Sequence, residues 1–537
     1  MFWSQTNRRF VLGMLGSAAL AIASGVQARD QAKKGDTAFT IAVIPDTQNY
    51  LDTAHERHMH SIDVPAPQPG ADAGEARWLA GDHHTHSRFS TGYDEKADPP
   101  TPTVGGDAIY PIPMNALMAR KFGLDWMVAT DHGGPNHSKV NHDHAYPELL
   151  RSRQLVPELV QFFGMEFDTP GADHSSIIVP AGDDEADRLR ELEKGYGARE
   201  AWPRDPSRNS EGRMLDALRT MDAQQPKPVL FAHHPSRSAT GMGKYGLTTP
   251  SKLRGWNDTA PEVAIGMEGA PGHQAAGQVG ESVGPSRYAA YFGDAIPRGA
   301  YGDFPTMGGF DQMTARLGGF WDSMLGEGRR WWITANSDSH INWTEGGFDF
   351  WPGEYSKTYV HAPKNPASII AAMRAGRIFV TTGDLVSELE ILLGTGADAR
   401  PIEFGSTINA GNGEPLHLTI RFRDPDGLNA NGDNPAVHHI DLIRGSVGTK
   451  SADPNLDRNP STRVVARFTE AEWKREGEWR VIETALEPVA GDEYLRLRGT
   501  NTEDAEPAPD AEGEDAWTDL WFYSNPVFLG SSMRRNP

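Results

Sequence analysis

At 537 residues the chain is too long for one ordinary hydrophobic core, so two or more domains are expected. A formal net charge of -22 argues against nucleic acid or an anionic membrane as a stable partner, and an anionic substrate would have to be held by local positive charge. Because the sequence contains no cysteine, disulfides and thiolate metal sites are excluded. Any metal ion must therefore be bound by His, Asp and Glu side chains.

An export signal is predicted for residues 1–28. Arg8 and Arg9 precede a modestly apolar run at residues 10–23, and small residues follow at the expected cleavage positions. This pattern resembles a twin-arginine signal, so we expect the twin-arginine translocase as a partner during export and a periplasmic or secreted protein. The run is too short and too rich in Gly and Ala for a typical transmembrane helix. No stable membrane insertion is expected, and an uncleaved anchor is the alternative.

Residues 29–74 are expected to form an N-terminal extension and linker. The apolar segment at residues 39–45 ends on Asp46 and resembles the first strand of calcineurin-like metallophosphoesterases, but no GNHD or GNHE motif follows it. The histidine-rich stretch HERHMH, at residues 55–60, precedes a Pro-rich segment and is interpreted as solvated linker.

Strand and helix signals alternate over residues 75–384, which we interpret as one domain. Helices are predicted at residues 113–123, 210–224, 312–325 and 366–376. For the last of these, Asn365 can cap the first turn, Pro366 takes the first helical position and Gly376 ends the helix. The alternation predicts an α/β barrel or a doubly wound sheet.

From residue 385 to residue 537 the pattern changes to short alternating strands separated by Gly, Asn, Asp and Pro. This pattern is typical of an all-β sandwich domain. The acidic stretch at residues 503–515 is expected to be a disordered loop. The segment DPDGLNANGD, at residues 424–433, has oxygen ligands for calcium, but its spacing does not fit the helical calcium loop and favours an ordinary turn.

Three histidines and an aspartate crowd into GDHHTHSRFSTG, residues 81–92, directly after an apolar strand-like run. Alternate side chains of a strand share a face, so His84 and His86 point the same way while His83 points to the other side. Two imidazoles on one face need only a carboxylate from elsewhere to form a zinc or related metal site. The pair alone is equally compatible with a polar strand end that faces solvent.

Further His, Asp and Glu residues stand at the ends of later predicted strands, or in one case at the start. They occur in ATDHGG with Asp131 and His132, GMEFD with Glu166, ADHSS with His174, FAHHPSR with His234, and NSDSH with Asp338 and His340. Many strands can supply ligands to one cluster when they run parallel into a common rim, as in an α/β barrel. The sequence therefore predicts a metal cluster at such a rim.

The motifs DxHxHS, TDH, GxE, HP and SDSH occur in this order within residues 78–384. Together they resemble the PHP family, the polymerase and histidinol phosphatase domains. The resemblance implies a distorted (β/α)7 barrel of about seven βα units. It also implies a cluster of two or three divalent metal ions, usually manganese, zinc or iron.

The resemblance also implies a set of ligands for each ion. The first site would comprise His84, His86, Glu166 and Asp338, and a second would share Glu166 with His174 and His234. A third site would use His132 and His340. Thr91 stands where the family often has an acid, so this third site lacks a ligand and two ions are expected to bind tightly.

Other polar residues near these motifs are given structural roles. Asp82 and Asp131 are expected to orient ligand imidazoles. His233 cannot share the face of His234 in a strand and is interpreted as packed or surface. Glu268 is interpreted as a salt-bridged rim residue, with a remote ligand as the alternative. Three histidines of the polar loop after TDHGG are expected at the surface: His137, His142 and His144.

The function expected from this resemblance is that of an exported metal-dependent phosphoesterase acting on small phosphate esters through a metal-bound hydroxide. Glu166, Asp338 and Arg237 are the candidate catalytic residues. Arg237 is either a bidentate phosphate clamp or a rim arginine without a role. The alternatives are a calcineurin-like metallophosphoesterase and a metal-bearing binding protein without catalysis, in which the sandwich domain does the binding.

A substitution at Asp46 separates the two kinds of phosphoesterase. The calcineurin-like resemblance rests on the segment that ends at Asp46. If the histidine cluster of residues 75–384 is the active centre instead, Asp46 has no part in catalysis and Asp46→Ala should keep the activity of the wild type. The measurement is phosphate ester hydrolysis by the purified variant. Loss of activity with normal folding would favour the calcineurin-like alternative.

Overall fold

The computed structural model describes residues 74–94, 96–276, 304–345, 347, 349–410, 414–489, 491–510 and 514–530. The predicted export signal, Asp46 and the HERHMH stretch lie outside these residues. The described chain has a mixed α/β fold with one large mixed sheet of 15 strands and a separate antiparallel sheet of five strands. None of its helices combines the length and the apolar character needed to span a membrane.

Eight neighbouring strands of the large sheet form the region in which the predicted metal ligands lie. In spatial order they are β10 (Ser356–Ala362), β1 (Arg77–Thr85), β4 (Trp126–Ala129), β5 (Val160–Phe167), β6 (Ser175–Ile178), β7 (Val229–Ala232), β8 (Ala264–Pro271) and β9 (Trp332–Asn336). Strands β1, β4 and β5 run parallel, as do β7, β8 and β9, whereas β6 is antiparallel to both of its neighbours. The carboxyl ends of the parallel strands and the start of β6 therefore share one edge.

At this edge the segment that follows β9 meets the end of β1. An isolated parallel bridge joins Thr85 to Ser339, and the amide of His86 donates to the carbonyl of Ser339 at 2.9 Å. The amide of Asp338 donates to the carbonyl of His84, also at 2.9 Å. Across the described ranges, no continuous ladder closes β9 onto β1 or β10. The sequence prediction is confirmed as a mixed α/β fold, while barrel closure is not observed.

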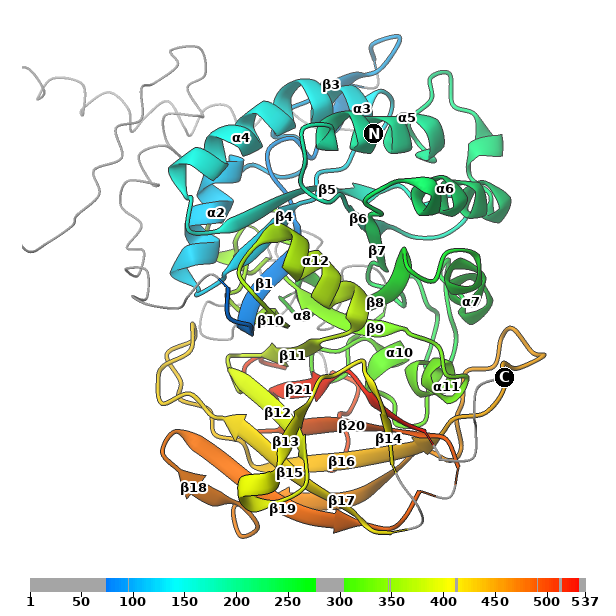
Figure 1. The fold of residues 1–537 in the computed structure, drawn as a ribbon. Helices are drawn as coiled ribbons and strands as arrows, with labels where there is room; N and C mark the ends of the chain where they lie inside the picture. Colours follow the sequence, from blue (N-terminus) through cyan, green and yellow to red (C-terminus); the bar gives the residue numbers. More distant parts are fainter. Residues whose placement is uncertain are drawn as a thin grey trace, which may run out of the picture. The chain divides into compact units, whose positions relative to one another are not determined.

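Helices lie around these strands (Figure 1): α2 (Ile112–Lys121), α4 (Tyr146–Leu155), α5 (Glu185–Tyr196), α6 (Glu211–Ala223), α7 (Pro250–Thr259) and α12 (Pro366–Ala375). Three of the predicted helices are confirmed as α2, α6 and α12. The Asn365 side chain accepts from the amide of Ser368 at 2.9 Å, and Gly376 ends α12 at a φ of 75°, so both ends are capped as expected.

Two predictions about helical segments are wrong. The helix expected at residues 312–325 is two short helices, α10 (Gln312–Ala315) and α11 (Phe320–Gly326), because Arg316 is extended and Gly318 has a φ of 69°. The loop expected after TDHGG is helical, with α3 (His137–Val140) followed by a π-helical segment (Asn141–Ala145). His137 is not at the surface but fully buried, with Nδ1 2.6 Å from Glu193 Oε1.

The C-terminal strands belong to both sheets. The large sheet contains β14 (Thr407–Asn409), β16 (His439–Ser446), β17 (Arg463–Thr469), β20 (Glu493–Thr500), β21 (Trp521–Ser524) and β22 (Val527–Gly530). The separate sheet has the order β13 (Arg400–Ile402), β12 (Glu388–Leu393), β15 (Leu416–Arg423), β19 (Trp479–Leu486) and β18 (Lys474–Glu476). Ile391 and Ile420 of this sheet share a buried cluster with Leu442 and Leu497 of the large sheet. The expected short strands are confirmed.

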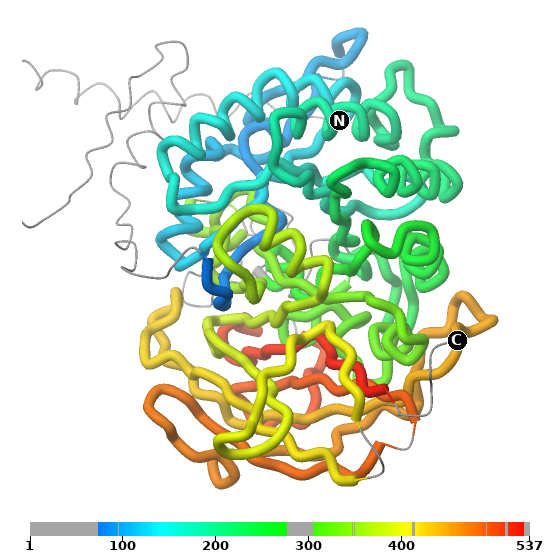
Figure 2. Tube along the Cα trace, in the orientation of Figure 1, coloured from blue at the N-terminus to red at the C-terminus, as the bar shows by residue number. Residues whose placement is uncertain are grey.

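The large sheet is continuous across residue 384, where the sequence predicts a domain boundary. Strand β11 (Ile378–Thr382) pairs with β10 on one side and with β21 on the other. In Figure 2 the red C-terminal strands lie beside the yellow-green segment that contains β11. The Asn525 side chain, between β21 and β22, exchanges two hydrogen bonds with the backbone of Ile333 in β9, at 3.0 and 3.1 Å.

The acidic stretch expected to be disordered is ordered where the structure describes it, up to residue 510 and again from residue 514. Glu506 pairs with the buried Arg498 at 2.6 Å. Asp510 accepts from the amides of Gly308 and Gly309, at 2.5 and 3.2 Å, and from the hydroxyl of Thr306. The prediction is wrong here because the acids have specific donors, Arg498 on the preceding strand for Glu506 and residues 306–309 for Asp510.

A buried ion pair joins α11 to β20. Arg496 donates to both carboxylate oxygens of Asp322, at 2.9 and 2.8 Å, and Tyr494 donates its hydroxyl to Asp322 at 2.9 Å. The side chains of Arg496 and Asp322 are 0% and 1% exposed. Because the charges are removed from water, each needs the other to offset its desolvation.

Asp322→Ala should lower the free energy of unfolding by about 3–5 kcal/mol, because it leaves the Arg496 charge buried without its partner. Equilibrium urea unfolding measures the change. The control is Asp216→Ala, which removes an ion pair whose side chains are 58% and 61% exposed and should change stability by less than about 1 kcal/mol. Equal effects of the two substitutions would contradict the prediction.

Candidate metal centre

The structure brings the eight predicted metal ligands together at the edge where the parallel strands end. His84 and Glu166 lie near the ends of β1 and β5, and the others flank β1, β4, β6, β7 and β9: His86, His132, His174, His234, Asp338 and His340. Each of the six histidines has a ring nitrogen within 3.6 Å of a carboxylate oxygen of Glu166 or Asp338.

Glu166 lies at the centre of this group and is 4% exposed. Its Oε1 is 3.3 Å from Nε2 of His84, 2.8 Å from Nδ1 of His174 and 3.2 Å from Nε2 of His234. Its Oε2 is 3.5 Å from Nε2 of His86. Glu166 thus contacts ring nitrogens from both the first and the second predicted ligand groups.

Asp338 supplies a second carboxylate on the same side as His84 and His86. Its Oδ1 is 3.0 Å from Nε2 of each histidine, and the two Nε2 atoms are 2.9 Å apart. Ligand atoms bonded to one zinc ion at about 2.0–2.1 Å lie roughly 3 Å from one another. The spacing of these donor atoms therefore fits one ion, and His84, His86 and Glu166 form a group compatible with a metal.

Outer contacts fix the orientation of both imidazoles. Nδ1 of His84 is 2.7 Å from Oε1 of the fully buried Glu268, and Nδ1 of His86 is 2.7 Å from the hydroxyl of Ser90. Ser90 in turn donates to Asp131 at 3.0 Å. An N–H at Nδ1 leaves the Nε2 lone pair facing the cluster, as in metal sites whose ligand histidines donate to a carboxylate or hydroxyl.

The roles given to the neighbouring acids need two corrections. Asp82 was expected to orient an imidazole, but it accepts from the amides of His84 and Ser337, both at 3.0 Å, and so ties the end of β1 to the end of β9. Glu268 was interpreted as a rim residue, yet it is buried and orients His84. Asp131 acts on His86 through Ser90, as the prediction of an orienting role requires.

His233 belongs to the cluster although strand alternation argued against it. Strand β7 ends at Ala232 and His234 has a φ of 22°, so the alternation of a strand no longer applies. Nδ1 of His233 is 2.9 Å from Glu166 Oε1, and its ring stacks on His84 with centroids 3.5 Å apart. Asp338 also has a positive φ, 51°, and such strained non-glycine residues gather at functional sites.

Burial and mutual charge perturb the titration of the cluster. Burial raises the pKa of Glu166, but His174, His84 and His132 outweigh it and hold that pKa well below its usual range. Burial lowers the pKa of His84, but three carboxylates, led by Asp338, raise it well above the ordinary value. Burial also raises the pKa of Asp82 to about 7. These contacts therefore favour the ionised form of Glu166.

The third predicted group also comes together, beside a carboxylate that the sequence analysis did not single out. His86, His132 and His340 form a group compatible with a metal. Asp107 Oδ2 lies 2.9 Å from Nε2 of His132 and 3.4 Å from Nε2 of His340. Thr91, the position that lacks an acid, places its hydroxyl 3.3 Å from that of Tyr93. No motif marks Asp107, so only the folded chain identifies it.

Two arginines flank the cluster. Arg237, the predicted phosphate clamp, donates from Nη2 and Nε to the two oxygens of Asp173, at 2.7 and 3.2 Å, and its side chain is 16% exposed. Arg199, which the sequence analysis did not single out, is 50% exposed. It donates to Asp168 at 2.7 Å and, through Nη2, to Nδ1 of His132 at 3.2 Å.

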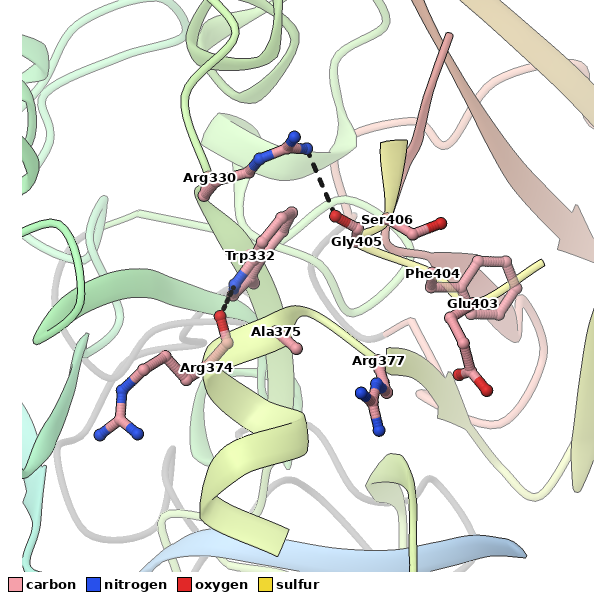
Figure 3. A pocket seen from close by; sticks show the side chains of 9 residues that line it. All are labelled: Arg330, Trp332, Arg374, Ala375, Arg377, Glu403, Phe404, Gly405 and Ser406. Atoms are coloured by element: carbon pink, nitrogen blue, oxygen red, sulfur yellow. Dashed lines mark hydrogen bonds between the residues drawn. The ribbon is translucent and has the colours of Figure 1, made fainter. Parts of the chain in front are cut away.

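Arginines also line a pocket at the junction of β9, α12 and the segment before β14. Figure 3 shows that the guanidinium groups of Arg330, Arg374 and Arg377 point in different directions. Arg330 donates to the carbonyl of Gly405 at 3.3 Å, and Arg374 donates to that of Glu262 at 2.9 Å. Because the three groups do not converge, and Arg330 and Arg374 already donate to backbone carbonyls, the histidine cluster remains the candidate site.

Comparison of the chain with models of known families, with curated proteins and with solved structures finds no match. The resemblance to PHP domains therefore rests on the motifs alone.

Glu166→Gln should remove most of the bound metal, because the amide cannot replace a bridging carboxylate. Elemental analysis after dialysis measures the metal content, and any hydrolytic activity should fall with it. Glu191→Gln, at an exposed position of α5, is the matched control and should bind as much metal as the wild type. Full metal content in Glu166→Gln would contradict the role of Glu166.

Proposed function

We propose that this protein is a metal-dependent phosphoesterase that hydrolyses small phosphate esters. The observation that carries the proposal is the gathering of six predicted ligand histidines around the buried carboxylates of Glu166 and Asp338. Divalent ions held by such a cluster activate water, bind phosphoryl oxygens and stabilise the leaving oxygen. Imidazole and carboxylate donors suit manganese, zinc or iron.

Glu166 and Asp338 have separate roles in this proposal. Glu166 would be shared by two ions, of which the second would be held with His174 and His234, whose ring nitrogens lie 2.8 and 3.2 Å from Oε1 of Glu166. Asp338 completes the first site with His84 and His86. Both carboxylates are buried, 4% and 1% exposed, so they hold the ions away from bulk water.

The substrate would approach from the more exposed side of the cluster. The side chains of His132 and His174 are 14% and 17% exposed, whereas those of His84 and His86 are fully buried. Asp168 and Arg199 lie on that side as well. The chain carries a net charge of -22, so an anionic substrate depends on the ions and on a nearby guanidinium for its attraction.

We further propose that the α/β region has the distorted (β/α)7 architecture of PHP domains, with residues 385–537 as an accessory β-sandwich. The order of the five motifs and the return of β9 to β1 through the Thr85 to Ser339 bridge support this assignment. The Arg8 and Arg9 pair supports export by the twin-arginine route to the periplasm or the medium.

The decisive experiment is elemental analysis of the purified protein followed by a screen of phosphate monoesters and diesters. The proposal expects bound metal and hydrolysis that a chelator abolishes and added metal restores. Bound metal without hydrolysis of any ester would instead favour a metal-bearing binding protein. Hydrolysis that survives complete removal of metal would contradict the proposal.

Arg199 and Arg237 compete for the role of phosphate ligand. Each guanidinium pairs with an aspartate, and exposure favours Arg199, whose side chain is 50% exposed against 16% for Arg237. Arg199→Ala should weaken transition-state binding by roughly 2–4 kcal/mol, as the loss of one oxyanion donor does, with metal content unchanged. Arg199→Lys should restore only part of the transition-state binding, because lysine keeps the positive charge but lacks the two-pronged guanidinium. Both are measured as kcat/KM.

Arg237→Ala is the matched comparison. A smaller loss of kcat/KM than in Arg199→Ala is expected, since the Arg237 side chain is less exposed to an approaching substrate. A larger loss of kcat/KM in Arg237→Ala than in Arg199→Ala, with metal retained, would show that Arg237 is the phosphate ligand, as the sequence predicted.

A further inference from the structure

We propose that a cavity outside the histidine cluster binds a small oxyanion, a carboxylate or a phosphate, through the guanidinium group of Arg316. The cavity has a volume of about 290 Å³. Its wall is formed by the loop between β7 and α7 at residues 233–249, the turn between α10 and α11 at residues 316–319, and the loop between β16 and β17 at residues 447–462. None of the eight predicted metal ligands lines it, so the inference does not depend on the proposed reaction.

Arg316 brings a positive charge to this wall that no acid offsets directly. Its side chain is partly buried and, among the residues that the structure describes, makes no hydrogen bond or ion pair. A Cβ atom added at Gly243 would lie 3.1 Å from Nη1 of Arg316, so the guanidinium group reaches the loop after β7. A guanidinium group has five donors and no acceptor, and its natural partners are carboxylates and phosphates.

The carboxylate that lines the cavity is already engaged by other residues. Tyr245 donates its hydroxyl to Oδ2 of Asp457 at 2.9 Å, and Oδ1 of Asp457 lies 3.9 Å from Nε of Arg458. Burial and Asp457 raise the pKa of the Tyr245 hydroxyl above its ordinary value, and Arg316 opposes this rise. Tyr245 therefore keeps its proton and remains the donor to Asp457.

The charge of the lining residues is positive, although the chain as a whole is acidic. Arg316 and Arg458 are the cations that line the cavity and Asp457 is the acid, which leaves one positive charge in excess. The whole chain carries -22, so its overall field repels anions. A small anion is therefore retained only where the local charge is reversed, as it is in this cavity.

Hydrogen bonds between the three segments form the cavity without a ligand. Nε2 of Gln312 donates to the carbonyl of Lys244 at 2.9 Å, and Oε1 of Gln312 accepts from the amide of Gly243 at 2.8 Å. The amide of Asn459 donates to the carbonyl of Gly318 at 2.9 Å. Because these bonds are already made, an anion that enters does not have to order the wall, and its binding is not weakened by that entropy.

The cavity shares a loop with the metal centre. Asp311, next to Gln312, accepts from the hydroxyl and the amide of Ser236, both at 2.8 Å. Ser236 stands two residues after His234, a predicted metal ligand, and nine residues before Tyr245 of the cavity. An anion bound at Arg316 therefore contacts the far part of the loop whose near part carries His234.

Isothermal titration calorimetry of the metal-loaded, full-length protein tests the site, with inorganic phosphate and succinate as separate probes. Arg316→Ala should weaken binding at the cavity by roughly ten- to hundredfold, because it removes a hydrogen-bonded charged group. The matched control is Arg219→Ala, which removes a 61% exposed arginine of α6 and should bind both anions as the wild type does. Phosphate held by the metal ions is common to all variants, so only the difference between variants is assigned to the cavity.

Asp457→Asn should have the opposite effect. The amide oxygen still accepts from Tyr245, but the negative charge is lost, so affinity for the anion should rise by up to about fivefold. A variant that fails to fold cannot bind more tightly, so a rise supports the site even if Arg316→Ala does not fold.

Unchanged binding of both anions in Arg316→Ala, or weaker binding in a folded Asp457→Asn, would overturn the inference. So would a wild type that binds neither anion after a chelator has removed its metal, and this result needs no variant. If the site stands, the anion that binds more tightly shows whether it takes a phosphate or a carboxylate. Hydrolysis and metal content are separate measurements, and the loss of either would leave the anion site unaffected.

Discussion

The contact between one buried carboxylate and the imidazoles around it is the interaction on which the site depends. Glu166 lies within 3.6 Å of ring nitrogens from His84, His86, His132, His174, His233 and His234. Packing so many rings around one acid requires backbone ends from separate strands to meet at one edge, and the parallel pairing of β1 with β4 and of β7 with β8 brings them there. His234 and Asp338 have positive φ angles, which are strained for residues other than glycine. The backbone at these two positions therefore adopts an unfavourable conformation to fit the cluster.

Much of this arrangement can be predicted from the sequence because strand geometry is regular. The shared face of His84 and His86 follows from alternation in β1, and their Nε2 atoms are indeed 2.9 Å apart. The caps of α12 follow from Asn365 and Gly376 for similarly local reasons. Where a candidate ligand lies within a regular strand, its neighbours in sequence determine where it points.

The parts that the sequence could not predict depend on loops and on distant contacts. The prediction for His233 is wrong because it assumes that β7 continues through this residue. The strand ends at Ala232, so the alternation of side chains does not apply to His233. Asp107 and Arg199 reach the cluster from loops whose path is set by backbone hydrogen bonds to other segments. The acids at residues 506 and 510 were expected to be solvated, since their donors, Arg498 and the amides near residue 308, are known only from the fold.

The continuous ladder from β10 through β11 to β21 has a consequence for how the protein is made on the ribosome. Residues 521–530 emerge after almost all of the metal ligands, yet Asn525 satisfies the backbone of Ile333 in β9, three residues before Asn336 and the turn to Asp338. The N-terminal region is synthesised first, but its sheet edge at β11 is covered only after the last strands have been synthesised. A nascent chain that stalls before residue 521 would therefore expose β11 as an unpaired edge.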